Sequence, residues 1–106
     1  MALKQGSSSG VDVVDVLHVL HAFEAINKCK LEITIYLQGS PARPEVWLKM
    51  WAWEPLVDRM EVQPLACQKI LIGSSGPRTM EAAILRALYA VDAQMAEEEL
   101  AKAIRK

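Results

Sequence analysis

The chain has 106 residues, of which 52% are hydrophobic and 24% are charged, and its formal net charge is −1. This length allows one domain with a single hydrophobic core, and the composition is typical of a globular protein. The near-neutral charge argues against a protein whose main task is to bind a phosphate backbone, because such domains usually carry a clear excess of basic residues.

The cysteines and the apolar runs indicate the compartment. Cys29 and Cys67 are too few for a disulfide framework, and they favour free thiols in a reducing cytosol. No apolar run approaches the ~20 residues that a membrane span needs, and the N-terminus lacks the apolar segment of a signal peptide. We therefore expect an intracellular protein that is neither secreted nor inserted in a membrane.

The N-terminal part of the chain predicts a tail and a helix. Residues 1–10 are rich in glycine and serine, which predicts a flexible tail before a single α+β domain at residues 11–106. A helix is expected over residues 11–28, with Ser9 as its N-cap. Its polar residues recur every third position, so apolar side chains cover most of its circumference, and such a helix lies deep or contacts another subunit. The expected core set is Val13, Val16, Leu17, Leu20, Phe23 and Ile26.

The middle of the chain predicts three strands. Residues 31–38 and 46–53 alternate between apolar and polar side chains, which is typical of half-buried strands. Residues 39–44 are rich in glycine and proline and predict the turn between them. A third strand is expected within residues 61–72, bent or bulged at Pro64, which suits an edge position.

The C-terminal part predicts a long helix that starts after Thr79, whose hydroxyl can cap it. Its first four turns should pack on the rest of the chain, and its last turns should project. The apolar face recurs at intervals of three and four residues and consists of Met80, Ala83, Ile84, Ala87, Leu88, Val91 and Met95. The expected fold is α-β-β-β-α, a three-stranded antiparallel meander with both helices on one face.

This order of elements resembles that of double-stranded RNA-binding domains. Those domains carry a cluster of lysines where their second helix begins. The matching stretch here, residues 76–83, offers only Arg78. The resemblance is one of topology, and RNA binding does not transfer with it.

Three tryptophans on the second strand, Trp47, Trp51 and Trp53, are the most distinctive side chains. With Tyr36 they form an aromatic patch if they lie on the sheet face away from the helices. Such a patch suits a protein partner or a second copy of the chain. With Lys49 it could also stack nucleic-acid bases. The third interpretation is that the faces are reversed and the tryptophans belong to the core.

The loop from Gly73 to Thr79 has the ingredients of an anion site, since it precedes a helix and carries Ser74, Ser75 and Arg78. It lacks the lysine followed by serine or threonine of a P-loop. An ordinary turn before a capped helix accounts for the same residues.

Catalytic and metal sites find little support. Asp15, His18 and His21 are spaced by three residues, as metal ligands on a helix can be, but the chain has no further histidine, and a partly exposed polar stripe explains the spacing. Cys67 would need a base beside it to act as a nucleophile, and only the two histidines could serve, so a buried structural cysteine is the simpler interpretation. The sequence therefore predicts no enzyme, no cofactor and no bound metal.

Three segments resemble small uncharacterised proteins of tailed phages: Leu-Glu-Ile-Thr-Ile-Tyr (31–36), the tryptophan strand, and Arg-Thr-Met-Glu-Ala-Ala-Ile-Leu-Arg-Ala-Leu-Tyr (78–89). The resemblance spans roughly residues 11–100 and brings no functional residues with it. It implies a viral accessory role in the virion or the host cytoplasm, as a capsid-associated or decoration protein or as a small inhibitor of a host factor.

The function expected from the sequence is a non-enzymatic protein-interaction module that assembles with itself or with a larger protein scaffold, most simply as a homo-oligomer. The expected contact residues are Tyr36, Trp47, Trp51, Trp53, Val19 and Phe23. The projecting end of the long helix is a further expected contact surface. The alternative is a small nucleic-acid or anion-binding domain that uses the loop at residues 73–79 and the face that carries Lys49 and the tryptophans.

Overall fold

A computed structural model of the chain describes residues 13–55, 60, 62–73 and 76–105. The predicted tail at residues 1–10 and the predicted cap Ser9 lie outside them. The elements are α2 (Val13–Asn27), β1 (Lys30–Ser40), β2 (Arg43–Trp53), β3 (Ala66–Ile72) and α3 (Met80–Arg105). The predicted order α-β-β-β-α is confirmed.

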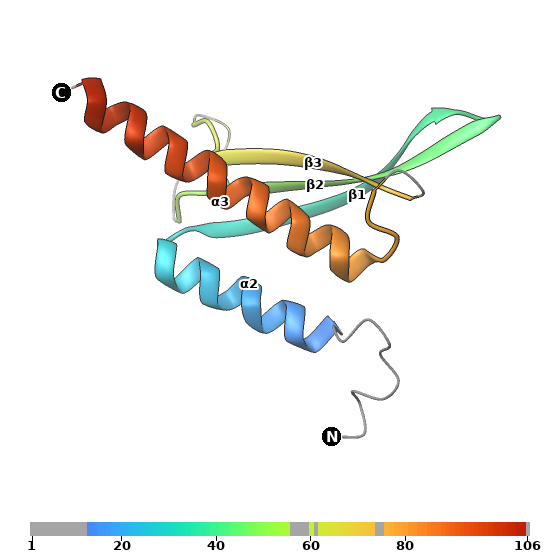
Figure 1. Ribbon diagram of the computed structural model, residues 1–106, viewed down its shortest axis with the longest axis horizontal. Coiled ribbons are helices and arrows are strands. Elements are labelled where there is room, and N and C mark those ends of the chain that lie inside the picture. Colours follow the sequence, from blue (N-terminus) through green and yellow to red (C-terminus); the bar gives the residue numbers. More distant parts are fainter. Residues whose placement is uncertain (1–12, 56–59, 61, 74–75, 106) are drawn as a thin grey trace.

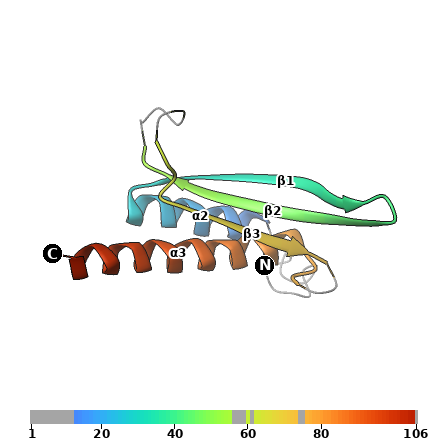
Figure 2. The ribbon, with the colours of Figure 1, turned by 90° about the horizontal axis from the view of Figure 1, so that it is seen from above.

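The three strands form one antiparallel sheet with β2 in the centre and β1 and β3 at the edges. Both helices lie on the same side of this sheet, which leaves the other face without a covering element among the described residues (Figures 1 and 2). The fold is therefore two layers, a sheet and a pair of helices. Neither helix in the described part is long and apolar enough to cross a membrane.

The core lies between the sheet and α3. Leu48, Met50 and Ala52 alternate along β2 toward the helices, and each is fully buried. Helix α3 meets them with small side chains, among them Ala83 and Ala87, which are also fully buried. Alanine at these positions lets the helix backbone approach the sheet closely.

Helix α2 packs with a narrower stripe than the sequence predicts. Val16 and Leu20 are buried, and Phe23 packs against them. Leu17 and Ile26, which were expected in the core, are 47% and 78% exposed, so their assignment was wrong. The reason is that α2 is covered on one side only, and a stripe of residues spaced by three and four is enough to fill that contact.

The turn predicted at residues 39–44 is present but shorter. β1 and β2 continue to the pair Ser40 and Arg43, so only residues 41 and 42 form the turn. Ser40 Oγ closes it by accepting a hydrogen bond from the Arg43 N–H at 3.1 Å. Pro44 has no backbone N–H to donate, but β2 tolerates it because the pairing with β3 ends at Val46. No residue of β3 lies beside Pro44 to need that hydrogen bond.

Strand β3 is shorter than expected and begins after Pro64. The N–H of Leu65 donates to the carbonyl of Ala52 at 2.7 Å, and the strand proper starts at the next residue. The proline thus precedes the strand and does not bend it. The predicted edge position is confirmed.

Helix α3 begins as predicted. Thr79 Oγ1 accepts a hydrogen bond from the Ala82 N–H at 3.1 Å, which is the geometry of an N-cap. Leu100 and Ile104 in its last turns are 62% and 74% exposed, and the helix extends past the sheet there (Figure 1).

Candidate functional site

The face of the sheet opposite the helices carries the aromatic residues. Alternation along β2 sends Trp47, Trp51 and Trp53 to this open face, because Leu48, Met50 and Ala52 point into the core. All three are half-buried. Tyr36 on β1 pairs with Trp47, so it lies on the same face. The interpretation that the tryptophans are core residues is therefore wrong.

Two indole rings are held in place by glutamates. Trp47 Nε1 donates a hydrogen bond to Glu45 Oε1 at 3.1 Å, and Trp53 Nε1 donates to Glu32 Oε1 at 2.8 Å. An indole whose N–H is already bonded has less rotational freedom to lose when a partner binds. The face is thus partly organised in advance.

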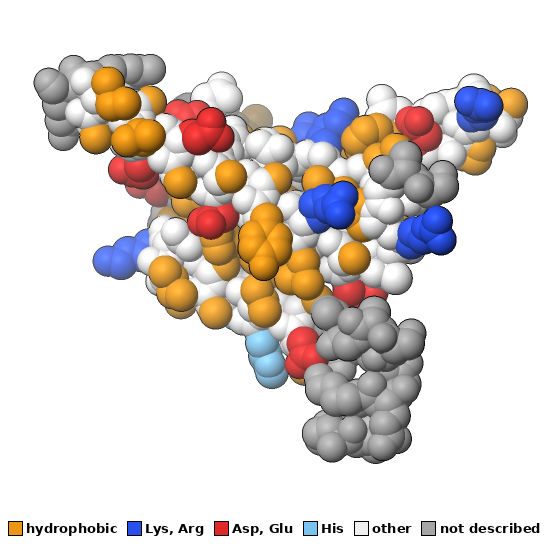
Figure 3. Space-filling view, in the orientation of Figure 1, with side chains coloured by type: hydrophobic (Ala, Val, Ile, Leu, Met, Phe, Trp, Pro, Cys, Tyr) orange, Lys and Arg blue, Asp and Glu red, His pale blue; other side chains and the backbone are white. Residues whose placement is uncertain are grey.

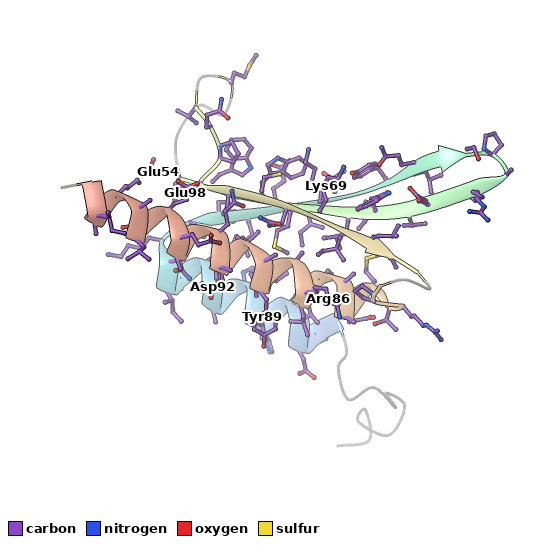
Figure 4. The ribbon with its side chains drawn as sticks, turned by 45° about the horizontal axis from the view of Figure 1, so that its top comes forward. Glu54, Lys69, Arg86, Tyr89, Asp92 and Glu98 are labelled. Atoms are coloured by element: carbon purple, nitrogen blue, oxygen red, sulfur yellow. The ribbon has the colours of Figure 1, made fainter. Side chains whose placement is uncertain are left out.

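Two lysines lie over indole rings of the same face. Lys49 Nζ is 5.0 Å from the centroid of Trp51, and Lys69 Nζ is 4.9 Å from that of Trp47. Cation–π contacts at exposed sites contribute roughly 0.5–1 kcal/mol each. Lys69 lies above the sheet in Figure 4, on the side away from the helices. The open face therefore combines aromatic area with two central cations and two flanking carboxylates.

Val19 and Phe23, the other predicted contact residues, lie in the helix layer. Together with Leu85, Tyr89 and Asp92 they line a hollow of about 140 Å³ between α2 and α3. Figure 3 shows apolar side chains gathered over the helices, and Figure 4 shows Tyr89 below the sheet. The six predicted contact residues thus divide between two surfaces, and the fold does not bring them together.

The predicted anion-binding residues are only partly described. Ser74 and Ser75 lie outside the described residues. Arg78 is exposed, and the hydroxyl of Thr79 is already used to cap α3. Among the described residues of this set, Arg78 is therefore the one cation that could bind an anion, and the Thr79 hydroxyl is already bonded within the helix start.

The backbone of the same loop closes on itself. The N–H of Gly73 donates to the Pro77 carbonyl at 2.9 Å, and the N–H of Gly76 donates to the Gly73 carbonyl at 3.0 Å. A Cβ on Gly76 would come within 2.5 Å of the Leu71 carbonyl oxygen, which explains the glycine sterically. The turn before a capped helix accounts for the described residues of this loop.

The candidate catalytic and metal residues do not converge. Cys67 is half-buried, not fully buried as expected, and it belongs to the alternate residues of β3 that point to the open face. His18 and His21 are on α2, so neither histidine lies beside it. His21 Nδ1 lies 3.4 Å from Glu24 Oε1 and is well exposed. Within the described ranges, no group of three His, Cys, Asp or Glu side chains is arranged to hold a metal ion.

Two polar contacts that the sequence did not reveal tie the helices to the edges of the sheet. Glu24 Oε2 on α2 accepts a hydrogen bond from the N–H of Leu31 on β1 at 2.7 Å. Gln94 Oε1 on α3 accepts from the N–H of Cys67 at 3.0 Å and from Gln68 Nε2 at 2.8 Å. The only available signal was a polar residue within a mostly apolar helical stretch.

Comparisons of this chain with protein-family models, with curated proteins and with solved structures find no match.

Proposed function

We propose that this chain is a non-enzymatic protein-interaction and assembly module whose open sheet face binds another protein surface, first of all that of further copies of the chain. The observation that carries the proposal is the sheet face that no described element covers, with its three half-buried tryptophans. Aromatic residues are enriched at the energetic centres of protein interfaces because they bury much area with few rotatable bonds.

The charges on this face favour an occupant with both apolar and acidic groups. Lys49 and Lys69 face each other across β2 and β3, so they place two cations at the middle of the face. The acidic residues Glu97, Glu98 and Glu99 on the exposed end of α3 offer a complementary surface on another copy. This favours a contact between the open face of one copy and the projecting end of α3 of another.

A nucleic acid is a poorer occupant of the same face. Trp51 and Trp47 each have a lysine over the ring, where a base would have to stack. Glu32 and Glu45 lie beside the tryptophans and would repel phosphates. Binding of RNA or DNA therefore has less support than binding of protein.

The place of such a module in a virus is part of the proposal and rests on the resemblance of its sequence segments to small proteins of tailed phages. A capsid-associated or decoration protein and a small inhibitor of a host factor both need a rigid contact surface and no catalytic site. The host cytoplasm and the virion are the corresponding locations.

The test is the mass of the purified chain, measured by light scattering over a range of concentrations for the wild type and two matched variants. Trp51→Ala removes an aromatic side chain from the open face, and Tyr89→Ala removes one that is 77% exposed on α3. We expect Trp51→Ala to weaken association about tenfold or more and Tyr89→Ala to leave it unchanged. Equal association of Trp51→Ala and the wild type would contradict the proposal, and so would a wild type that stays monomeric at every concentration.

A further inference from the structure

We propose that two copies of this chain join through the free edges of their β1 strands, antiparallel and about a twofold axis at Ile35. The two three-stranded sheets would then form one continuous sheet, with the helices of both copies on the same side. The inference goes beyond the proposed function, because it concerns the edge of the sheet and not its aromatic face.

The backbone of β1 offers hydrogen-bonding groups that the described residues do not use. Alternate residues of an edge strand direct their N–H and C=O groups away from the neighbouring strand. The N–H of Leu31 bonds to Glu24 on α2, so Leu31 belongs to the outward set. The register with β2 is unbroken, so the groups of Ile33, Ile35 and Leu37 point the same way, and β1 has no second strand beside it in the described sheet.

The opposite edge is better protected. Strand β3 has 7 residues against 11 in β1, and Pro64 precedes it. Each edge has one outward N–H bonded by a helix side chain, that of Cys67 by Gln94 on β3 and that of Leu31 by Glu24 on β1, so this feature does not separate them. Lys69, the next outward position, carries a charge. Short length, a nearby proline and a lysine are features that natural sheets use to prevent edge pairing, and β1 has none of them between Leu31 and Leu37.

The hairpin half of β1 also carries apolar side chains that the chain itself leaves uncovered. Ile35 and Leu37 point to the helix side of the sheet, but they are 42% and 77% exposed. The β1–β2 hairpin extends beyond both helices (Figures 1 and 2). These residues therefore form an apolar knob without a helix beneath it.

The N-terminal half of β1 borders a hollow instead of carrying a projecting apolar knob. A hollow of about 230 Å³ lies between α2 and the start of β1, lined by Leu17, Leu20, His21, Glu24, Lys30, Leu31 and Ile33. Leu17 on its α2 side is 47% exposed. Leu37 of the knob and the β1 residues that line the hollow thus lie on the same strand, on opposite sides of Ile35.

A twofold axis at Ile35 brings the two shapes together. Antiparallel pairing places Leu37 of each copy opposite Ile33 of the other, at the mouth of the hollow. Ile35 then faces its own counterpart. Leu31 falls opposite Gly39 at the end of the ladder, so it can keep its bond to Glu24.

The polar side chains of β1 are also compatible with this antiparallel register. On the open face it sets Glu32 of one copy opposite Gln38 of the other, and Thr34 opposite Tyr36. No like charges meet directly, so this register brings no charge repulsion between the paired strands. The occupant is therefore a second copy of this chain, since one patch supplies both complementary parts, as a twofold interface requires.

The first experiment compares the dimer dissociation constants of three variants by sedimentation or light scattering. Ile35→Pro removes an outward N–H and leaves the bonds between β1 and β2 intact, and Leu37→Lys places a charge in the knob. We expect each to weaken dimerisation at least about thirtyfold. Tyr89→Lys adds the same charge on α3, at a side chain that is as exposed as Leu37 (77%) and outside the paired strands, and this control should dimerise like the wild type.

The second experiment needs no variant and covers the case that Ile35→Pro fails to fold. Amide hydrogen exchange is measured on the wild type below and above the dissociation constant. We expect the amides of Ile33, Ile35 and Leu37 to become slow only in the dimer. Those of Thr34 and Tyr36 should be protected in both states, because they point to β2. Fast exchange of the three edge amides in the assembled protein would overturn the inference.

The two proposals fail separately. If Trp51→Ala dissociates the protein while Ile35→Pro and Leu37→Lys do not, the edge pairing is wrong and the aromatic contact stands. If the edge variants alone dissociate it, the proposed role of the open face is wrong and the edge pairing stands. A wild type that stays monomeric, with fast edge amides at every concentration, overturns the pairing.

Discussion

Gln94 on α3 and Cys67 on β3 are joined by a hydrogen bond of 3.0 Å, in which the amide oxygen of Gln94 accepts from the backbone N–H of Cys67. The same oxygen accepts a second bond from Gln68 at 2.8 Å. The contact joins residues 27 positions apart in the chain. It anchors the long helix beside the edge of the sheet.

Replacing this amide should loosen that anchor. Gln94→Leu keeps a side chain of similar size and leaves two donors on β3 without their acceptor. We expect a loss of about 1–3 kcal/mol in the free energy of unfolding, measured by urea denaturation. Gln63→Leu, at an exposed position, is the control and should change stability by less than about 0.5 kcal/mol. Equal stability of the two variants would contradict the role given to Gln94.

The end of α2 offers a stabilising substitution. Lys28 has a φ of 52°, in the left-handed region, and the N–H of Cys29 donates to the Glu24 carbonyl at 3.2 Å. This is the geometry of a helix end that glycine favours. Lys28→Gly should therefore raise the melting temperature, with a gain of about 0.5–1 kcal/mol, whereas Lys28→Ala should bring no gain. A gain from alanine as large as that from glycine would show that backbone strain is not the cause.

The buried thiol of Cys29 should make stability depend on pH in the alkaline range. Burial raises the pKa of Cys29 above its ordinary value of 9.0, and the nearby negative charge of Glu24 adds to the effect. As the pH rises, the unfolded chain loses its thiol proton before the folded chain does, so the unfolded state binds fewer protons and stability falls. The contribution is complete below about pH 9 and is lost as the pH rises through the folded pKa.

Cys29→Ala should remove this part of the pH dependence. The free energy of unfolding, measured under reducing conditions between pH 8 and pH 10.5, should fall less steeply for the variant than for the wild type. Parallel curves for the two proteins would show that Cys29 does not cause the slope.

Among the substitutions considered, truncation of Leu48 in the central strand should cause the largest loss of stability. Leu48 is fully buried between the sheet and the helices, and Leu48→Ala should cost about 2–5 kcal/mol because it leaves a cavity. Ile104→Ala removes a similar side chain that is 74% exposed on α3 and should cost less than about 1 kcal/mol. Denaturant midpoints measure both, and similar losses would contradict the assignment of the core.

The sequence alone determined the elements and their order, because each is encoded by a local pattern. Alternation around Leu48 and Met50 predicts the central strand, and the hydroxyl of Thr79 before an apolar repeat predicts the start of the long helix. Such signals depend on neighbours within a few positions. They therefore do not depend on how the elements pack together.

Only the tertiary structure decided which of these surfaces are covered. Leu17 and Leu20 look equally apolar in the sequence, yet one is 47% exposed and the other is buried, because α2 has a neighbour on one side only. The open face of the tryptophans, the free edge of β1 and the bond from Glu24 to Leu31 depend in the same way on residues distant in the chain. Burial is a property of the packed layers, and no local pattern specifies it.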